Sequence, residues 1–221
     1  MSAASAELFG SPQAAALYKA AARGDMEQAR QLMAQGADLN TPNAKKQTLL
    51  KVAMLEGKRK AFDNLLALGA DPTYLGSAKD APIHLAASLE DPYWLKTMLE
   101  HGASTEARNA LGETPLFPAV GHNTRENFRI LLEAGASVHA RRKDGGTLLH
   151  EAAAINSFAD IPRLLELGVD PTARDDLGYT FQYGLFDTPE NILGSEAKAI
   201  REQVTAWLRQ RGIPLEGTSR P

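Results

Sequence analysis

The segment LLEAGAS, residues 131–137, contains the sequence feature that decides the fold. Its glycine, Gly135, has counterparts at a fixed step of 33 residues, and each one follows an apolar run. The matching segments are LMAQGAD (32–38), LLALGAD (65–71), MLEHGAS (98–104) and LLELGVD (164–170). Self-similarity at a period between about 20 and 50 residues indicates a solenoid, in which each copy buries its apolar face against its neighbours.

Two further markers repeat at the same step. A threonine or alanine followed by proline, leucine or phenylalanine occurs at 48–49, 81–82, 114–115, 147–148 and 180–181. An alanine follows at Ala20, Ala53, Ala86, Ala119 and Ala152, with Leu185 in the last copy. Threonine can cap a helix through its hydroxyl, and proline at the first helical position loses no hydrogen bond that the helix needs. The markers therefore predict a helix start in each copy.

The strings APIHLAA (81–87), ETPLFPAV (113–120) and GTLLHEAA (146–153) resemble the ankyrin family, over about residues 12–215. The resemblance implies an all-α solenoid of about six helix-turn-helix repeats with connecting β-hairpins or turns, to which the length of the last copy adds an extended C-terminal capping helix. It also implies a concave face lined by hairpin tips and first helices. Pro118 departs from the pattern, because it removes a backbone donor one turn into its helix.

The period predicts one domain over residues 11–215, between flexible ends at 1–10 and 216–221. Its repeats are expected at about 11–40, 41–73, 74–106, 107–139, 140–172 and 173–215. The sixth is longer, because Gly212 follows Gly168 by 44 residues, which predicts an insertion near 186–194. A capping helix from about Ser195 would then place Ile200, Val204, Trp207 and Leu208 on one face. Gln182, where the other copies carry Leu or Ile, suggests a polar outer end.

Composition limits the classes of partner. The chain has 24 Lys and Arg against 27 Asp and Glu, a net charge of −3, and no long basic run, so we expect no nucleic acid partner. No apolar stretch approaches the length of a membrane span, so we expect no membrane insertion.

The start MSAASAELFG lacks the basic and apolar regions of a signal peptide. Two interpretations remain open: a cytosolic protein, or an exported one whose signal is absent from this sequence.

The sequence offers no catalytic constellation. His150-Glu151 would need a second histidine at position 154 to bind zinc, and that residue is Ala154. His150 and His84 occupy the same position within their repeats, which we call the same phase. This favours a structural role in which the histidine bonds its own threonine and the adjacent hairpin. The insertion offers only Asp187, Thr188, Glu190 and Asn191. We therefore expect no enzyme activity, no catalytic residue, no metal site and no cofactor.

Repeat phase predicts which side chains are available to a protein partner. The ends of the first helices should form a concave row with exposed apolar side chains, and the hairpin tips a second row that is modestly basic. The predicted contact residues are Lys45, Leu55, Glu56, Leu89, Leu111, His122, Arg141, Lys143, Ile155, Asp176 and Tyr179. An acidic partner is one open possibility. The alternative is that scattered surface leucines have no role.

Tyr93 and Trp94 occupy phases that hold polar or small residues in the other copies. Two interpretations are open: a second contact patch on the convex side, or local repacking caused by the neighbouring Asp91-Pro92. We favour repacking, because Pro92 replaces a residue that would itself help to pack the helix.

A narrower resemblance is carried by ELFGSPQAAALYKAAARGDMEQARQLMAQGADLN (7–40), ETPLF (113–117) and LLHEAAAINSFADIPRLLELGVDPTARDDLGYT (148–180). These runs are similar to bacterial ankyrin proteins encoded beside type VI secretion phospholipase or lipase effectors. That resemblance implies an immunity protein, monomeric when free, that binds one folded toxin and occludes its active site in the periplasm. The alternative is a cytosolic ankyrin adaptor or a host-directed effector scaffold.

Overall fold

The computed structural model describes residues 8–76 and 78–216, apart from the side chain of His122. Within these residues the regular structure is entirely helical, which confirms the predicted fold class. The chain divides into two compact units, residues 1–110 and 111–221, and each is described by itself.

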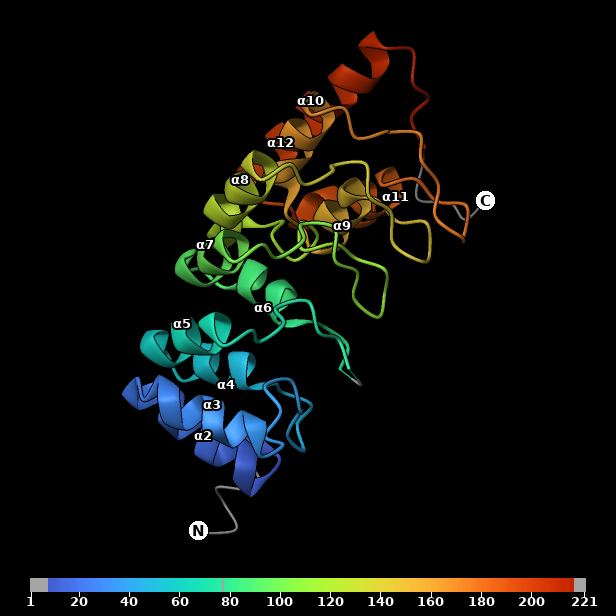
Figure 1. Ribbon diagram of the computed structural model, residues 1–221. Helices are drawn as coiled ribbons and strands as arrows, with labels where there is room; N and C mark the ends of the chain where they lie inside the picture. Colours follow the sequence, from blue (N-terminus) through green and yellow to red (C-terminus); the bar gives the residue numbers. More distant parts are fainter. Residues whose placement is uncertain (1–7, 77, 217–221) are drawn as a thin grey trace. The chain divides into compact units, whose positions relative to one another are not determined.

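The first unit contains three pairs of antiparallel helices (Figure 1). They are α2 (Pro12–Arg23) with α3 (Met26–Ala34), α4 (Leu49–Leu55) with α5 (Arg59–Ala67), and α6 (Pro82–Ser88) with α7 (Tyr93–Glu100). Helix α2 packs on α3 and α5, and α4 packs on α5 and α6. Leu17, Leu50 and Ile83, at one phase of successive first helices, are 0% exposed, so they form the core of this unit.

Local residue chemistry sets the bounds of these helices. The Ser11 side chain accepts a hydrogen bond from the Ala14 N–H, and Pro12 opens α2. Gly24 ends α2 with a φ of 85°, a left-handed conformation that glycine adopts without strain. Asp25 then caps α3 by accepting from the Gln28 N–H. The chain can therefore reverse direction within three residues.

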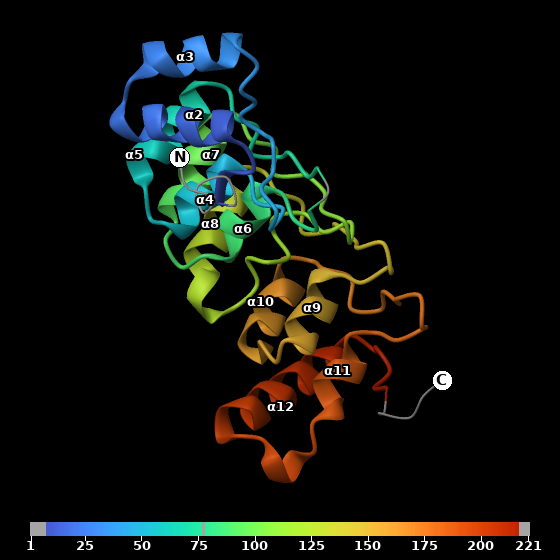
Figure 2. The same cartoon turned by 90° about the horizontal axis from the view of Figure 1, so that it is seen from below.

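The second unit contains helices of less regular length (Figure 2). They are η1 (His122–Thr124), α8 (Arg125–Glu133), α9 (Leu148–Ala154), η2 (Phe158–Asp160), α10 (Ile161–Glu166), α11 (Gln182–Asp187), η3 (Glu190–Ile192) and α12 (Ser195–Gln210). Helix α9 packs on α10 and α11, while α12 packs on α10 and η2. The predicted capping helix is thus present, with Val204 and Leu208 buried and Ile200 and Trp207 half-buried.

The first helix of the fourth repeat departs from the helix-turn-helix pattern, in the segment that contains Pro118. Residues 115–119 form successive turns, with hydrogen bonds from the Phe117 N–H to Thr114 O and from the Val120 N–H to Phe117 O. Pro118 cannot donate a backbone bond and clashes with a continuous α-helix, which explains the change. Leu116 and Phe117 nevertheless remain buried, so this segment keeps its contribution to the core.

The connections before the first helices are turns, and no strand is assigned within residues 8–76 and 78–216. We call these turns fingers; those of repeats two, five and six span 43–47, 142–146 and 175–179. Asn43 Oδ1 accepts from the Lys45 and Gln47 N–H groups, and Asp175 Oδ1 accepts from those of Leu177 and Tyr179. Such side-chain bonds stabilise a tight loop without a strand ladder.

The end of the second unit corrects the interpretation of Gln182 as an exposed polar residue. Its side chain is buried, and its amide donates to Pro214 O at 3.1 Å and accepts from the Glu216 N–H at 3.0 Å. The Thr180 hydroxyl also donates to Glu216 Oε2 at 2.7 Å. The chain therefore folds back over its last repeat, and of the predicted flexible C-terminus, residues 217–221 lie outside the described part.

The predicted flexible N-terminus is described only from residue 8 onwards. Phe9 is buried, with its ring centroid 4.7 Å from that of Tyr18. The Leu8 carbonyl accepts a hydrogen bond from the Asn43 side-chain amide at 2.7 Å. These contacts attach residues 8 and 9 to the first two repeats.

The geometry around Tyr93 and Trp94 favours repacking. Trp94 is buried, and its ring packs edge-on against Phe62 at a centroid distance of 5.0 Å. Tyr93 donates its hydroxyl hydrogen to Asp63 Oδ1 at 2.5 Å, and burial and this bond raise its pKa to about 12. The Arg59 guanidinium lies 4.2 Å from the Tyr93 ring centroid. The two aromatics thus join the second helices of repeats two and three.

We predict that Trp94→Ala lowers the free energy of unfolding by about 3–5 kcal/mol, because it leaves a cavity beside Phe62. Leu55→Ala, at a side chain 56% exposed in the same unit, should change it by no more than about 0.5 kcal/mol. Urea denaturation followed by circular dichroism measures both. Equal stability of Trp94→Ala and the wild-type protein would show that Trp94 is not part of the core.

Candidate interaction site

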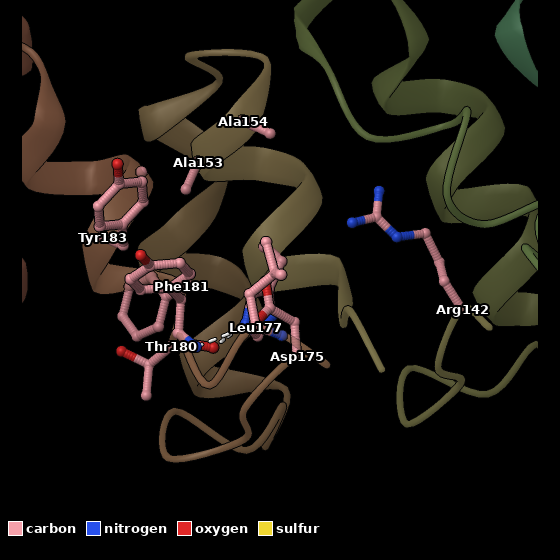
Figure 3. Close-up of a pocket in the computed structure, with 11 residues that line it drawn as sticks. Arg142, Ala153, Ala154, Asp175, Leu177, Thr180, Phe181 and Tyr183 are labelled. Atoms are coloured by element: carbon pink, nitrogen blue, oxygen red, sulfur yellow. Dashed lines mark hydrogen bonds between the residues drawn. The ribbon is translucent and has the colours of Figure 1, made fainter. Parts of the chain in front are cut away.

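A hollow of the second unit lies between α9, α11 and the sixth finger, with a volume of about 450 Å³ (Figure 3). It is lined by Arg142, His150, Ala153, Ala154, Asp175, Leu177, Tyr179, Thr180, Phe181, Tyr183 and Gly184. Arg142 faces it from the side opposite Phe181 and Tyr183. Its volume falls in the range of small-molecule and side-chain pockets.

Gly184 provides room for this hollow. At the same phase the other copies carry Lys19, Val52, Leu85, Pro118 and Glu151. A Cβ at position 184 would lie 3.1 Å from Ala153 Cβ, closer than ordinary van der Waals contact. The absence of a side chain thus lets α11 approach α9 and leaves the space in front of Ala153 and Ala154 unfilled.

Aromatic and apolar side chains form one wall. The rings of Tyr179 and Tyr183 stack with centroids 4.2 Å apart and an interplanar angle of 29°. Phe181 beside them is buried and belongs to the core. Leu177, at the tip of the sixth finger, is 74% exposed, the highest value among the large apolar side chains of the described residues. Exposed aromatic and apolar groups beside a hollow are typical of protein contact sites.

Arg142 forms the opposite wall and is surrounded by carboxylates. It pairs with Glu151 at 2.8 Å, Asp144 at 3.2 Å and Glu113 at 3.8 Å. Its side chain is only 19% exposed, so solvent screens these pairs less than those on an open surface. The three carboxylates therefore carry more negative charge than the single positive charge of the Arg142 guanidinium at this wall of the hollow.

His150 connects α9 to the sixth finger. Its Nδ1 accepts from the Thr147 N–H at 3.1 Å, which leaves the proton on Nε2, and Nε2 donates to Tyr179 O at 3.1 Å. Burial lowers the pKa of this imidazole, despite the bond to Tyr179 O and the attraction of Asp175. His150 is thus a neutral structural histidine that positions Tyr179, as predicted.

Comparison with known proteins identifies the repeats. The family description "Ankyrin repeats (3 copies)" matches residues 80–175. Human cyclin-dependent kinase inhibitor 2A is 34% identical over 114 residues, which cover 50% of this chain and 72% of that protein. A solved ankyrin repeat domain from Acinetobacter baumannii has a TM-score of 0.65 at 25% identity, covering 90% of this chain and 98% of that one. The chain belongs to the ankyrin-repeat family.

A bacterial relative matches at higher identity. Protein PhlB of Serratia liquefaciens is 39% identical over 106 residues, which cover 48% of this chain and 46% of PhlB. The chain therefore spans less than half the length of this relative. Ankyrin repeats are protein–protein interaction modules, and that is the general function of this chain.

The predicted contact residues of the second unit gather around the fingers and the hollow. Tyr179 lines the hollow, Asp176 is exposed beside Asp175, and Ile155, 47% exposed, directly follows Ala154. Arg141 and Lys143 are exposed on either side of Arg142. Leu111 is 42% exposed, and its carbonyl accepts from the Lys143 N–H. The side chain of His122 lies outside the described part.

The remaining predicted residues lie in the first unit. Lys45 is exposed on the second finger, and Leu55 is exposed at the end of α4. Glu56 is exposed, and its carboxylate accepts from the Tyr18 hydroxyl at 2.7 Å. Leu89 corrects the expectation of an exposed leucine: it is half-buried, because α6 ends at Ser88 and Leu89 adopts extended backbone with a ψ of 148°.

Of the eleven residues that line the hollow, Tyr179 alone is among the predicted contact residues; the missing ones include Arg142, Asp175, Leu177, Tyr183 and Gly184. A comparison of these positions with the preceding repeat contained a sequence signal. Tyr183 shares the phase of His150, and Gly184 shares that of Glu151, so both depart from the preceding copy. Such departures in the last repeat could have indicated a site, but the sequence does not show that they meet at one hollow.

Among the described residues, no cluster of three or more His, Asp or Glu side chains is arranged to hold a metal ion. No described helix is long and apolar enough to cross a bilayer.

We predict that His150 makes stability depend on pH. Its pKa is lower in the folded than in the unfolded chain, so its contribution is complete above the ordinary value of 6.5 and is lost as the pH falls below it. The loss of unfolding free energy between pH 7.5 and 5.5 should thus be smaller in His150→Gln than in the wild-type protein. Urea titrations at both pH values measure it, and parallel losses would contradict the prediction.

Proposed function

We propose that this ankyrin-repeat chain is an immunity protein that binds a bacterial phospholipase or lipase toxin and blocks access to its active site. The observation that carries the proposal of a binding surface is the exposed apolar finger tip, Leu177, beside the stacked rings of Tyr179 and Tyr183. The narrower partner class rests on the similarity of residues 7–40 and 148–180 to ankyrin proteins encoded beside such toxins.

Inhibition by occlusion suits a repeat stack, since it requires affinity and no chemistry. The fingers are held by side-chain and cross-repeat bonds, such as the Asp176 N–H to Asp144 O at 2.8 Å. Few residues would have to be ordered on binding, and this lowers the entropic cost of association. The relative cyclin-dependent kinase inhibitor 2A is, by its name, an inhibitor of an enzyme, which supports an inhibitory role for a chain of this family.

The proposal also concerns compartment. A toxin that acts on phospholipids in the periplasm would require the immunity protein in the same compartment. We therefore expect a signal peptide or lipobox upstream of residue 1 in the native gene. Fractionation of the native organism would test this, and protein confined to the cytoplasm would favour an adaptor or a host-directed effector scaffold.

The decisive experiment titrates the full chain into the purified lipase or phospholipase encoded beside its gene and follows hydrolysis of phospholipid vesicles. We predict stoichiometric, one-to-one inhibition. Leu177→Asp should weaken binding by about thirtyfold or more, because it places a charge at the centre of the contact.

Ile192→Asp is the matched control, since Ile192 is 69% exposed in the same unit and does not line the hollow. Its affinity for the toxin should equal that of the wild-type protein. Absence of inhibition, together with recovery of several unrelated cytosolic proteins on the tagged chain, would refute the immunity proposal and support the adaptor.

A further inference from the structure

We propose that the hollow is a receptor for one basic side chain of the partner protein, a guanidinium or an ammonium group. This inference rests on the proposed function only in assigning the cation to a protein partner. The chemistry of the hollow itself, in which Asp175 and a pair of aromatic rings line one space, carries the choice of a cation.

The charge around the hollow is negative. Of its lining residues, Arg142 and Asp175 carry charge, and Arg142 is shared among three carboxylates, those of Glu113, Asp144 and Glu151. One guanidinium thus stands among three carboxylates, and Asp175 adds a further negative charge at the hollow. This arrangement favours a basic group at the hollow over the acidic partner that the sequence left as an open possibility, because Arg142, the basic residue that lines the hollow, is already paired with carboxylates.

The other basic residues of the fingers do not line the hollow. Arg141 donates to the carbonyl of Arg174, at 3.0 Å, and Arg174 itself pairs with Glu216. Lys143 is exposed on the fifth finger. A cation in the hollow therefore lies between Asp175 with the aromatic wall on one side and, on the other, Arg142, whose charge is paired with carboxylates.

The tyrosine pair provides the second element of recognition. Tyr179 and Tyr183 stack on each other, are half-buried and both line the hollow. A cation within about 6 Å of a tyrosine ring centroid is stabilised by the ring quadrupole. Arg59 and Tyr93 make such a contact at 4.2 Å elsewhere in this chain. A guanidinium can stack on a ring and bond a carboxylate at once, which favours arginine over lysine.

Gly184 adds the necessary space. In the preceding copy, Glu151 at this phase extends to Arg142 and forms an ion pair. In the last copy the corresponding positions hold Asp175 on the finger and Gly184 on the helix, so position 184 supplies no charge to pair with Asp175. A basic side chain from a partner would occupy the position that completes the pair.

Small probes test this chemistry without the toxin. N-acetyl-arginine methylamide is titrated into the full chain and followed by NMR of the Ala153 and Ala154 methyl groups. The norleucine and glutamate analogues are the neutral and anionic probes. We expect saturable binding of the arginine probe in the millimolar range, at least about threefold weaker binding of norleucine, and no binding of glutamate.

Asp175→Asn is the decisive variant. It removes the charge and keeps the oxygen that accepts from the Leu177 and Tyr179 N–H groups, as Asn43 does at the same phase of repeat two. We expect it to weaken the arginine probe about threefold to tenfold. Asp176→Asn removes an exposed neighbouring carboxylate that does not line the hollow, and should leave binding unchanged.

Filling the space provides an independent test. Gly184→Leu should abolish binding of the arginine probe, whereas Gly194→Leu, where a Cβ would meet nothing within 4 Å, should not. Equal affinity for arginine and norleucine, or equal effects of Asp175→Asn and Asp176→Asn, would overturn the inference. Probe binding in a chain that does not inhibit the toxin would refute the partner class and keep the cation site.

Discussion

No repeat of this chain can bury its own apolar face, so each helix pair depends on the next. Within the first unit Leu17, Leu50 and Ile83 are fully buried at the same phase of successive first helices. Within the second unit Leu116 and Leu149 occupy that phase and are equally buried. At the same phase of the sixth repeat, Gln182 binds the returning backbone of residues 214–216 instead.

A polar contact between neighbouring repeats accompanies this packing. Lys51 Nζ donates to Asp80 O, and His150 Nε2 donates to Tyr179 O, each across 29 residues. Burial lowers the pKa of both side chains. Two chemically different residues thus make the same connection from a first helix to the following finger. A buried carbonyl needs a donor, and either group supplies one.

The candidate site arises where the last repeat departs from this regular scheme. Gly184 replaces longer side chains, Asp175 replaces Arg142, and Tyr183 replaces His150 in the corresponding positions of the preceding copy. Each change alone alters one side chain. Together they form a hollow with an aromatic wall and a carboxylate. The carboxylate lies on the sixth finger, which His150 holds through its hydrogen bond to Tyr179 O. In a repeat protein, such irregular positions distinguish one partner from another, because the regular positions maintain the core.

The sequence by itself determined the repeat, its period, most helix starts and the core phase, because these follow from local capping chemistry and from apolar spacing. It also indicated the structural role of His150 and the extended last repeat. Only the tertiary structure decided that Pro118 converts a helix into turns, that Leu89 is half-buried, and that Gln182 is covered by the chain end. It alone brought Arg142, Asp175 and Tyr183 to one hollow. Burial, ion pairing and cavity shape depend on side chains from different repeats, and a linear pattern does not specify how those side chains meet.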